Sequence, residues 1–194
     1  MTLASNKEEF RWSIRKQGKN VVNMCTRVFL FNSVLIGLMA SAAGVAMANP
    51  SGGSVTAGSA TISSTGSELQ INQSTNKAII EWNSFNIDAG ETTRFIQPGS
   101  SSIALNRVVN SSQLSTINGN LIANGRVVII NPNGVLIGAN GNVDAAGFIA
   151  TTADIYNNSF MNSTGALEFN RPGNLDASVE NRGHITRSEE HTSE

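Results

Sequence analysis

Residues able to carry out catalysis are scarce in this chain of 194 residues, and their spacing suits no common active site. The two histidines are His184 and His191, and the single cysteine is Cys25. The sequence therefore offers no Ser-His-Asp triad with a credible base, and no His and Cys cluster at metal-ligand spacing. Disulfide bonds are also excluded after Cys25.

Three aspartates come nearest to a catalytic carboxylate pair of the kind found in glycoside-cleaving β-helices. Asp88, Asp144 and Asp154 are widely separated and lie at expected turns, where Asp is common for backbone reasons. The segment 138–144 (GANGNVD) lacks the register and repetition of a calcium-binding glycine repeat. No glycine-rich phosphate loop leads into a helix. We therefore predict no enzyme, no cofactor and no metal site.

The most specific local pattern is the tetrapeptide Asn131-Pro132-Asn133-Gly134. Pro132 fixes φ at the second position of a β-turn, Asn133 suits the third, and Gly134 can take a positive φ. The Asn131 side chain can close an Asx-type hydrogen bond onto the backbone. We predict a turn here that helps to determine the fold.

Asn-Gly pairs recur through the same region. They are Asn118-Gly119, Asn124-Gly125, Asn133-Gly134 and Asn140-Gly141. Both residue types tolerate a positive φ, so each pair is predicted to be a turn. The side chains of Asn118, Asn124 and Asn140 could instead form amide ladders between neighbouring coils, a second reading that the pattern leaves open.

Short apolar runs with strand character separate these turns. Val127–Ile130 and Val135–Ile137 are rich in β-branched residues, and Leu69 and Ile71 alternate with polar neighbours. No helical period extends over 11 residues after Asn49. The pattern predicts an all-β fold, a right-handed single-stranded parallel β-helix of the pectin-lyase-like kind, with an N-terminal cap near Asn49–Ser67. An open sandwich is the alternative.

Four aromatic residues stand out from the small polar background. They are Trp82, Phe85, Phe95 and Phe148. We predict that they pack in the core or the cap, with carbohydrate stacking as the second reading.

Charge is unevenly distributed along the chain. Residues 1–48 carry a net charge of +4 and the remainder carries −5. A basic stripe is missing from the acidic remainder, which argues against nucleic-acid binding.

The basic N-terminal part is typical of a secretory signal peptide, read by the Sec translocon. Residues 1–27 form a basic n-region, and residues 28–48 form an apolar h-region that ends in Ala46-Met47-Ala48. We predict a signal-peptide helix cleaved before Asn49. A transmembrane anchor is the alternative, since about 20 apolar residues can span a bilayer.

The last residues, 187–194 (RSEEHTSE), change character abruptly. Their high charge and lack of strand pattern predict a non-native tail derived from a sequencing adapter. We expect the native chain to continue beyond Thr186, so that the domain over residues 49–186 is truncated.

Three segments carry a resemblance to a known family. Ile80–Pro98, Ile117–Gly138 and Ala145–Ile155 resemble the N-terminal secretion domain of filamentous haemagglutinin and related two-partner secretion exoproteins. Asn131–Gly134 matches the NPNG motif of that family, together with its flanking strands. A second, NPNL-type motif of some members is not found here, which leaves the subfamily open.

The resemblance implies a secretion-targeting domain of a large surface exoprotein of the adhesin, haemagglutinin, haemolysin or contact-dependent toxin kind. It implies that the POTRA domains of a cognate outer-membrane transporter recognise the extended chain, with Asn131–Gly134 as a candidate contact. The product would be secreted or displayed on the bacterial surface, and its downstream region could bind a host surface. A polysaccharide-active β-helix enzyme and an autotransporter passenger are the alternative functions.

Overall fold

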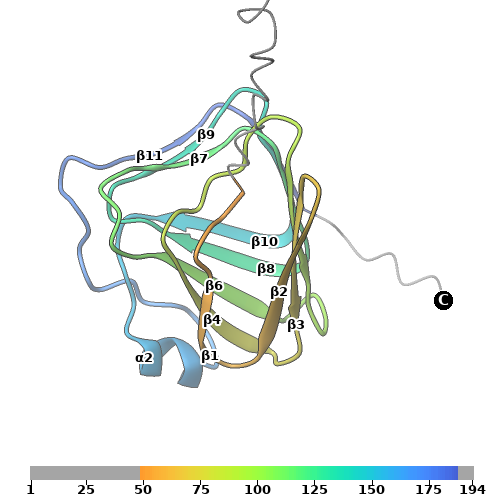
Figure 1. Cartoon of the computed structure of the whole chain (residues 1–194). Coiled ribbons are helices and arrows are strands. Elements are labelled where there is room, and N and C mark those ends of the chain that lie inside the picture. The colour runs from red at the N-terminus through yellow and green to blue at the C-terminus, as the bar shows by residue number, and fades with distance from the viewer. Residues whose placement is uncertain (1–48, 188–194) are drawn as a thin grey trace, which may run out of the picture. The chain divides into compact units, whose positions relative to one another are not determined.

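The structure, a computed structural model, describes residues 49–187, which fold into a right-handed parallel β-helix of about four turns (Figure 1). Some predicted features lie outside the described residues: the signal peptide over residues 1–48, with Ala46 and Ala48 of its cleavage site, and the tail after Arg187. Within residues 49–187, no helix is long and apolar enough to cross a membrane.

Each turn of the solenoid runs along three faces. The first face contains β3 (Glu68–Gln73), β5 (Thr92–Ile96), the first halves of β8 (Asn120–Ile130) and β10 (Asn142–Thr151), and β12 (His184–Arg187). The second contains β4 (Lys77–Trp82), β6 (Ile103–Val108) and the second halves of β8 and β10. The third contains β7 (Ser115–Ile117), β9 (Val135–Ile137) and β11 (Val179–Asn181). All pairings within these faces are parallel, as the sequence predicts.

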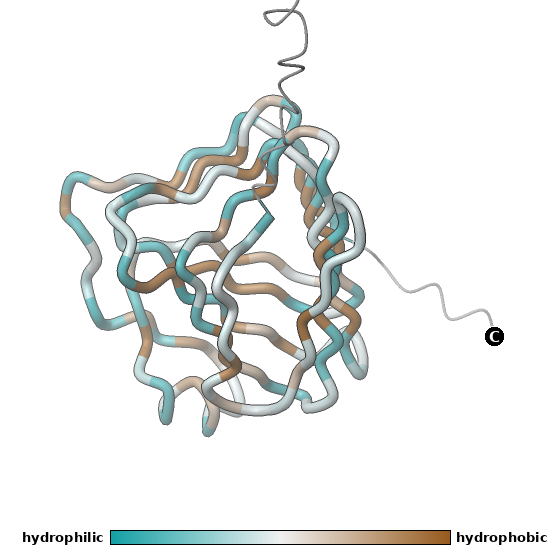
Figure 2. The backbone as a smooth tube through the Cα atoms, viewed as in Figure 1, coloured by the Kyte–Doolittle hydropathy of each residue, from teal (hydrophilic) through white to brown (hydrophobic). Residues whose placement is uncertain are grey.

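The coils stack in register, so side chains form columns along the axis. One column on the first face runs through Leu69, Thr93, Leu121, Val143 and Ile185. Its first four members are buried, and so is most of the inner surface of the other faces. Hydrophobic residues accordingly recur along the stacked strands (Figure 2). Burial of these columns supplies the main driving force for folding.

Antiparallel strands cap the N-terminal end of the stack. β1 (Ser54–Ala57) pairs with β4, and β2 (Ala60–Thr65) pairs with β3. These strands cover the edge that the first coil would otherwise expose to another chain. The predicted cap over Asn49–Ser67 is confirmed.

The second face is covered on its outer side as well. Ile79, Leu105 and Val128 point away from the solenoid interior and pack with Ile155 and Phe160. Phe160 belongs to the short helix α2 (Asn157–Asn162), which the sequence reading did not anticipate because six residues give no helical period. Burial on both sides explains why the run at the end of β8 is continuously apolar rather than alternating.

A lysine of the first coil holds this cover in place. Lys77 Nζ donates to the carbonyl oxygens of Phe160 (2.8 Å), Met161 (3.2 Å) and Ser163, and lies 5.6 Å from the centroid of the Phe160 ring. A cation at the C-terminal end of a helix satisfies carbonyls that have no partner within the helix. Burial, and then the positive charge of Arg126, lowers the pKa of Lys77.

We expect Phe160→Ala to lower the free energy of unfolding by about 3–5 kcal/mol, because it leaves a cavity in a core that no other residue can fill. Urea unfolding followed by circular dichroism measures the change. The control is Leu175→Ala, since Leu175 is 94% exposed. Equal stabilities for the two variants would contradict the outer core described above.

Candidate functional site

The tetrapeptide Asn131–Gly134 forms the predicted β-turn between β8 and β9. Gly134 N donates to Asn131 O at 3.0 Å, which closes the turn. Asn133 N donates to Asn131 Oδ1 at 3.0 Å, the predicted Asx-type bond. Gly134 has a φ of 113°, which an L-residue with a side chain rarely adopts. The geometry therefore explains why Asn stands at position 131 and Gly at position 134.

Asn131 is buried, with 1% of its surface exposed, and it joins three consecutive coils. Its Nδ2 donates to Gln113 O and Ser115 Oγ, both at 3.0 Å, in the preceding coil. Its backbone N donates to Thr151 O at 3.1 Å in the following coil. A buried amide so fully bonded contributes to the register of the stack rather than to an exposed surface.

The rest of the turn is also held from both sides. Asn133 Nδ2 donates to Ser111 O at 2.7 Å, and Pro132 O accepts from Asn174 N at 3.1 Å. A Cβ added to Gly134 would lie 2.8 Å from Ser178 O. In the folded domain the turn is therefore enclosed by the segments before and after it.

The other Asn-Gly pairs correct part of the sequence reading. Asn118-Gly119 and Asn140-Gly141 do connect strands, but Asn124-Gly125 lies inside β8, where the strand passes from the first face to the second. The expected positive φ is wrong for these three glycines.

These glycines are required by close approach instead. A Cβ on Gly119 would strike Asp88 O, and one on Gly141 would strike Ile117 O. A Cβ on Gly125 would lie 2.8 Å from Ser102 O. At each corner the backbone of one coil rests directly on a carbonyl of another, so only glycine fits.

For Asn124 the ladder reading describes the contacts better than the turn reading. Asn124 Oδ1 accepts from Gln97 N at 2.7 Å, and Asn124 Nδ2 donates to Gln97 O at 2.8 Å. Gln97 Nε2 donates in turn to Gln73 Oε1 at 3.0 Å. This amide ladder joins three coils at the corner between the first and second faces.

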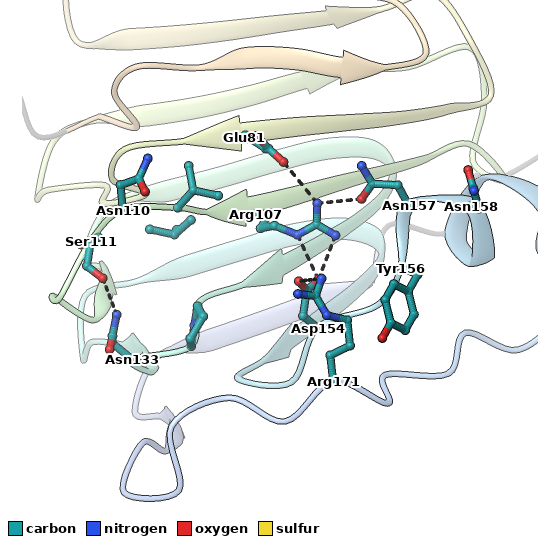
Figure 3. Close-up of a pocket in the computed structure, with 13 residues that line it drawn as sticks. Glu81, Arg107, Asn110, Ser111, Asn133, Asp154, Tyr156, Asn157, Asn158 and Arg171 are labelled. Atoms are coloured by element: carbon teal, nitrogen blue, oxygen red, sulfur yellow. Dashed lines mark hydrogen bonds and ion pairs between the residues drawn. The ribbon is translucent and has the colours of Figure 1, made fainter.

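A groove of about 790 Å³ lies beside the Asn131–Gly134 turn, and a buried arginine forms its floor (Figure 3). Arg107 bonds Asp154 Oδ1 at 2.9 Å, Asn157 Oδ1 at 2.8 Å and Glu81 Oε1 at 3.4 Å. Arg171 bonds the other Asp154 oxygen at 3.0 Å. The sequence reading missed this network, although an arginine in the buried strand Ile103–Val108 signals a buried ion pair.

The groove is not arranged for acid–base catalysis. Asp154 is committed to two arginines, and Asp88 and Asp144 lie on other parts of the solenoid. Among residues 49–187 no group of three His, Cys, Asp or Glu side chains could hold a metal ion. Trp82, Phe85 and Phe95 are buried, which leaves these three rings no free face for sugar stacking, and Phe148 is partly buried against the same core. Trp82 also donates to Asn106 Oδ1 at 3.0 Å.

Comparisons with known proteins agree with this architecture. The family model of the TPS secretion domain matches residues 46–193. The crystal structure of the HMW1 secretion domain from Haemophilus influenzae superimposes with a TM-score of 0.66 at 37% identity, covering 73% of this chain and 37% of that one. Two heme/hemopexin-binding proteins of Haemophilus influenzae are 42% identical over 106 residues and 41% identical over 91 residues. These alignments cover 55% and 47% of this chain.

The fold and the family match together define a class, the β-solenoid secretion domains. The chain belongs to the TPS secretion domain family, found in two-partner-secreted exoproteins that cross the outer membrane to the cell surface or the medium. The alignments span only 12% and 10% of the length of the two heme/hemopexin-binding proteins.

We expect Asn131→Ala to lower the free energy of unfolding by about 1–3 kcal/mol, because Gln113 O and Ser115 Oγ of the preceding coil lose the partner that the Asn131 side chain gives them. Asn140→Ala is the matched control, since Asn140 is exposed in a turn of the same stack. Urea unfolding of both variants measures the difference. Indistinguishable midpoints would show that the bonds of Asn131 do not stabilise the domain.

Arg107→Met should cost about 3–5 kcal/mol, since it leaves Asp154 without its buried partner. The control is Arg171→Ala, which removes a half-exposed arginine from the same carboxylate and should cost about 0–1 kcal/mol. Thermal unfolding monitored by circular dichroism distinguishes the two. A smaller loss for Arg107→Met than for Arg171→Ala would refute the assignment of Arg107 as the centre of the network.

Proposed function

We propose that this domain directs a larger exoprotein to a cognate outer-membrane transporter, whose periplasmic POTRA domains bind the chain in extended form. The domain then starts β-helix folding as it leaves the transporter. The match of residues 46–193 to the TPS secretion domain family is the observation that carries this proposal. The burial of Asn131 supports a role for its turn in folding.

The contacts of the solenoid suit folding in the order of export. Each strand pairs with strands of the adjacent coils, and the cap strands β1 and β2 pair with the first coil. In such a stack each coil can form on the one before it, without waiting for distant parts of the chain. The cap would emerge first and give the first coil a template.

Within this order, the Asn131–Gly134 turn locks the third coil to the second. The partners of the Asn131 amide, Gln113 and Ser115, both precede it in the chain. They are therefore present when the turn emerges. Asn131 thus acts through folding, and its effect on secretion follows from the stability of the nascent stack.

The contacts of Asn49 suit a chain that is cleaved just before this residue. Its Nδ2 donates to Ser67 O at 2.9 Å, and its Oδ1 accepts from Thr93 Oγ1 at 3.1 Å. Cleavage after Ala48 would leave a new N-terminus tied to the cap and the first face. We propose that the Sec translocon and signal peptidase deliver this form to the periplasm.

The domain itself is proposed to be non-catalytic, and to need no cofactor or nucleic acid. The two carboxylates that line the groove, Glu81 and Asp154, are both held in ion pairs with Arg107. Binding to a host surface would belong to parts of the exoprotein outside this domain.

We expect Asn131→Ala and Gly134→Ala to reduce secretion severalfold in cells that co-express the transporter, with unchanged synthesis. A less stable fold outside the cell would provide less free energy to drive export. Immunoblots of the medium and of whole cells measure the ratio, with Asn140→Ala as control. Parental amounts of all three variants in the medium would count against a role for the turn.

A binding assay separates folding from direct contact. The urea-unfolded chain, diluted onto immobilised POTRA domains, should bind equally well with and without Asn131→Ala. Loss of binding in the variant would mean that the transporter contacts the Asn131 side chain directly.

A further inference from the structure

The four Asn-Gly steps of the solenoid are also the steps at which an asparagine most readily loses its side-chain amide. The backbone N of the following residue attacks the side-chain Cγ, and a glycine there offers no side chain to hinder it. The new N–Cγ bond forms as the Cγ–Nδ2 bond breaks and ammonia leaves. Water then opens the cyclic imide to aspartate or isoaspartate, with no oxidant or reductant required.

In the folded domain each of these steps is restrained. The attacking nitrogens of Gly119, Gly134 and Gly141 donate to Ile87 O (3.0 Å), Asn131 O (3.0 Å) and Gly138 O (2.8 Å). These bonds occupy the N–H that must be lost for the attack. At Asn124 the side chain is restrained instead, because both of its polar atoms bond Gln97.

Asn131, whose side chain makes three hydrogen bonds, is protected in another way. Its next residue is Pro132, whose nitrogen has no hydrogen to lose and cannot form the imide by this route. The chain therefore combines one buried asparagine that resists the reaction with four that depend on folding for protection.

We propose that Asn118, Asn124, Asn133 and Asn140 are deamidation sites of the unfolded chain, and that the solenoid closes them when it folds. The modification would also prevent correct stacking at two of them. A carboxylate at position 124 would place an oxygen where Nδ2 now lies, 2.8 Å from Gln97 O. At position 133 it would place one 2.7 Å from Ser111 O.

These two sites give the unfolded chain a limited lifetime. A chain that waits too long before folding acquires opposed oxygens between its coils, and the resulting loss of stability is irreversible. Asn140 differs because its side chain is exposed, so its conversion should leave the stack intact. Asn124 and Asn133 are thus sites at which deamidation damages the stack, and Asn140 is a site in the same solenoid at which it does not.

The first test follows the reaction directly. The whole chain is incubated in warm, mildly alkaline buffer, with and without enough urea to unfold it, and peptide mapping by mass spectrometry follows each asparagine. We expect all four sites to react in urea, and each of them to react at least about tenfold more slowly when folded. Asn131 should stay unmodified in both samples.

The second test uses variants that mimic the product. Asn124→Asp and Asn133→Asp should each reduce the folding equilibrium constant at least about tenfold, whereas Asn140→Asp should match the parent. If Asn124→Asp or Asn133→Asp fails to fold while Asn140→Asp folds, that result also supports the proposal. Equal reaction rates in the folded and unfolded chains, or Asn124→Asp and Asn133→Asp as stable as Asn140→Asp, would overturn the proposal.

Discussion

Direct contact between the backbones of successive coils is the constraint on which the rest of this structure depends. At the corners, carbonyl groups of one coil lie where a Cβ of another would be, so Gly119, Gly125 and Gly141 have no substitutes. Between the corners, parallel pairing places equivalent residues above one another, which turns a local strand pattern into continuous columns. The solenoid can therefore add coils without changing its cross-section, as repeat architectures do.

Stacking alone does not fix which coil lies on which, because apolar columns tolerate slippage. Buried amides supply that information. Asn131 forms hydrogen bonds with specific residues of the preceding and the following coil. The ladder of Gln73, Gln97 and Asn124 joins three coils in the same way at another corner. Each amide loses its partners if the register shifts by one residue, and an unsatisfied buried amide is costly. These polar groups thus specify the register that apolar burial stabilises.

The same arrangement connects the fold with export. In the function proposed above, the domain stays extended until it has passed through the outer membrane and then folds coil by coil. Three features suit this order of folding: the cap strands β1 and β2, the pairing of each coil with the next, and the Asn131–Gly134 turn, whose partners precede it in the chain. In this order the outer cover around α2 forms only after the first three coils, because Phe160 contacts Lys77 of the first coil. Completion of the domain is therefore coupled to the arrival of residues far along the chain.

The sequence by itself determined the all-β class, the stacked short strands, the N-terminal cap and the Asn131–Gly134 turn, because each has a signature within a few neighbouring residues. It also identified the family, through the NPNG motif and its flanks. Only the tertiary structure decided the helix over the second face, the Arg107 network and the reason for the corner glycines. Those features depend on pairs such as Lys77 with Phe160 and Arg107 with Asp154, which are about 50 to 80 residues apart. Such pairs meet only through the pitch of the solenoid, which no local pattern encodes.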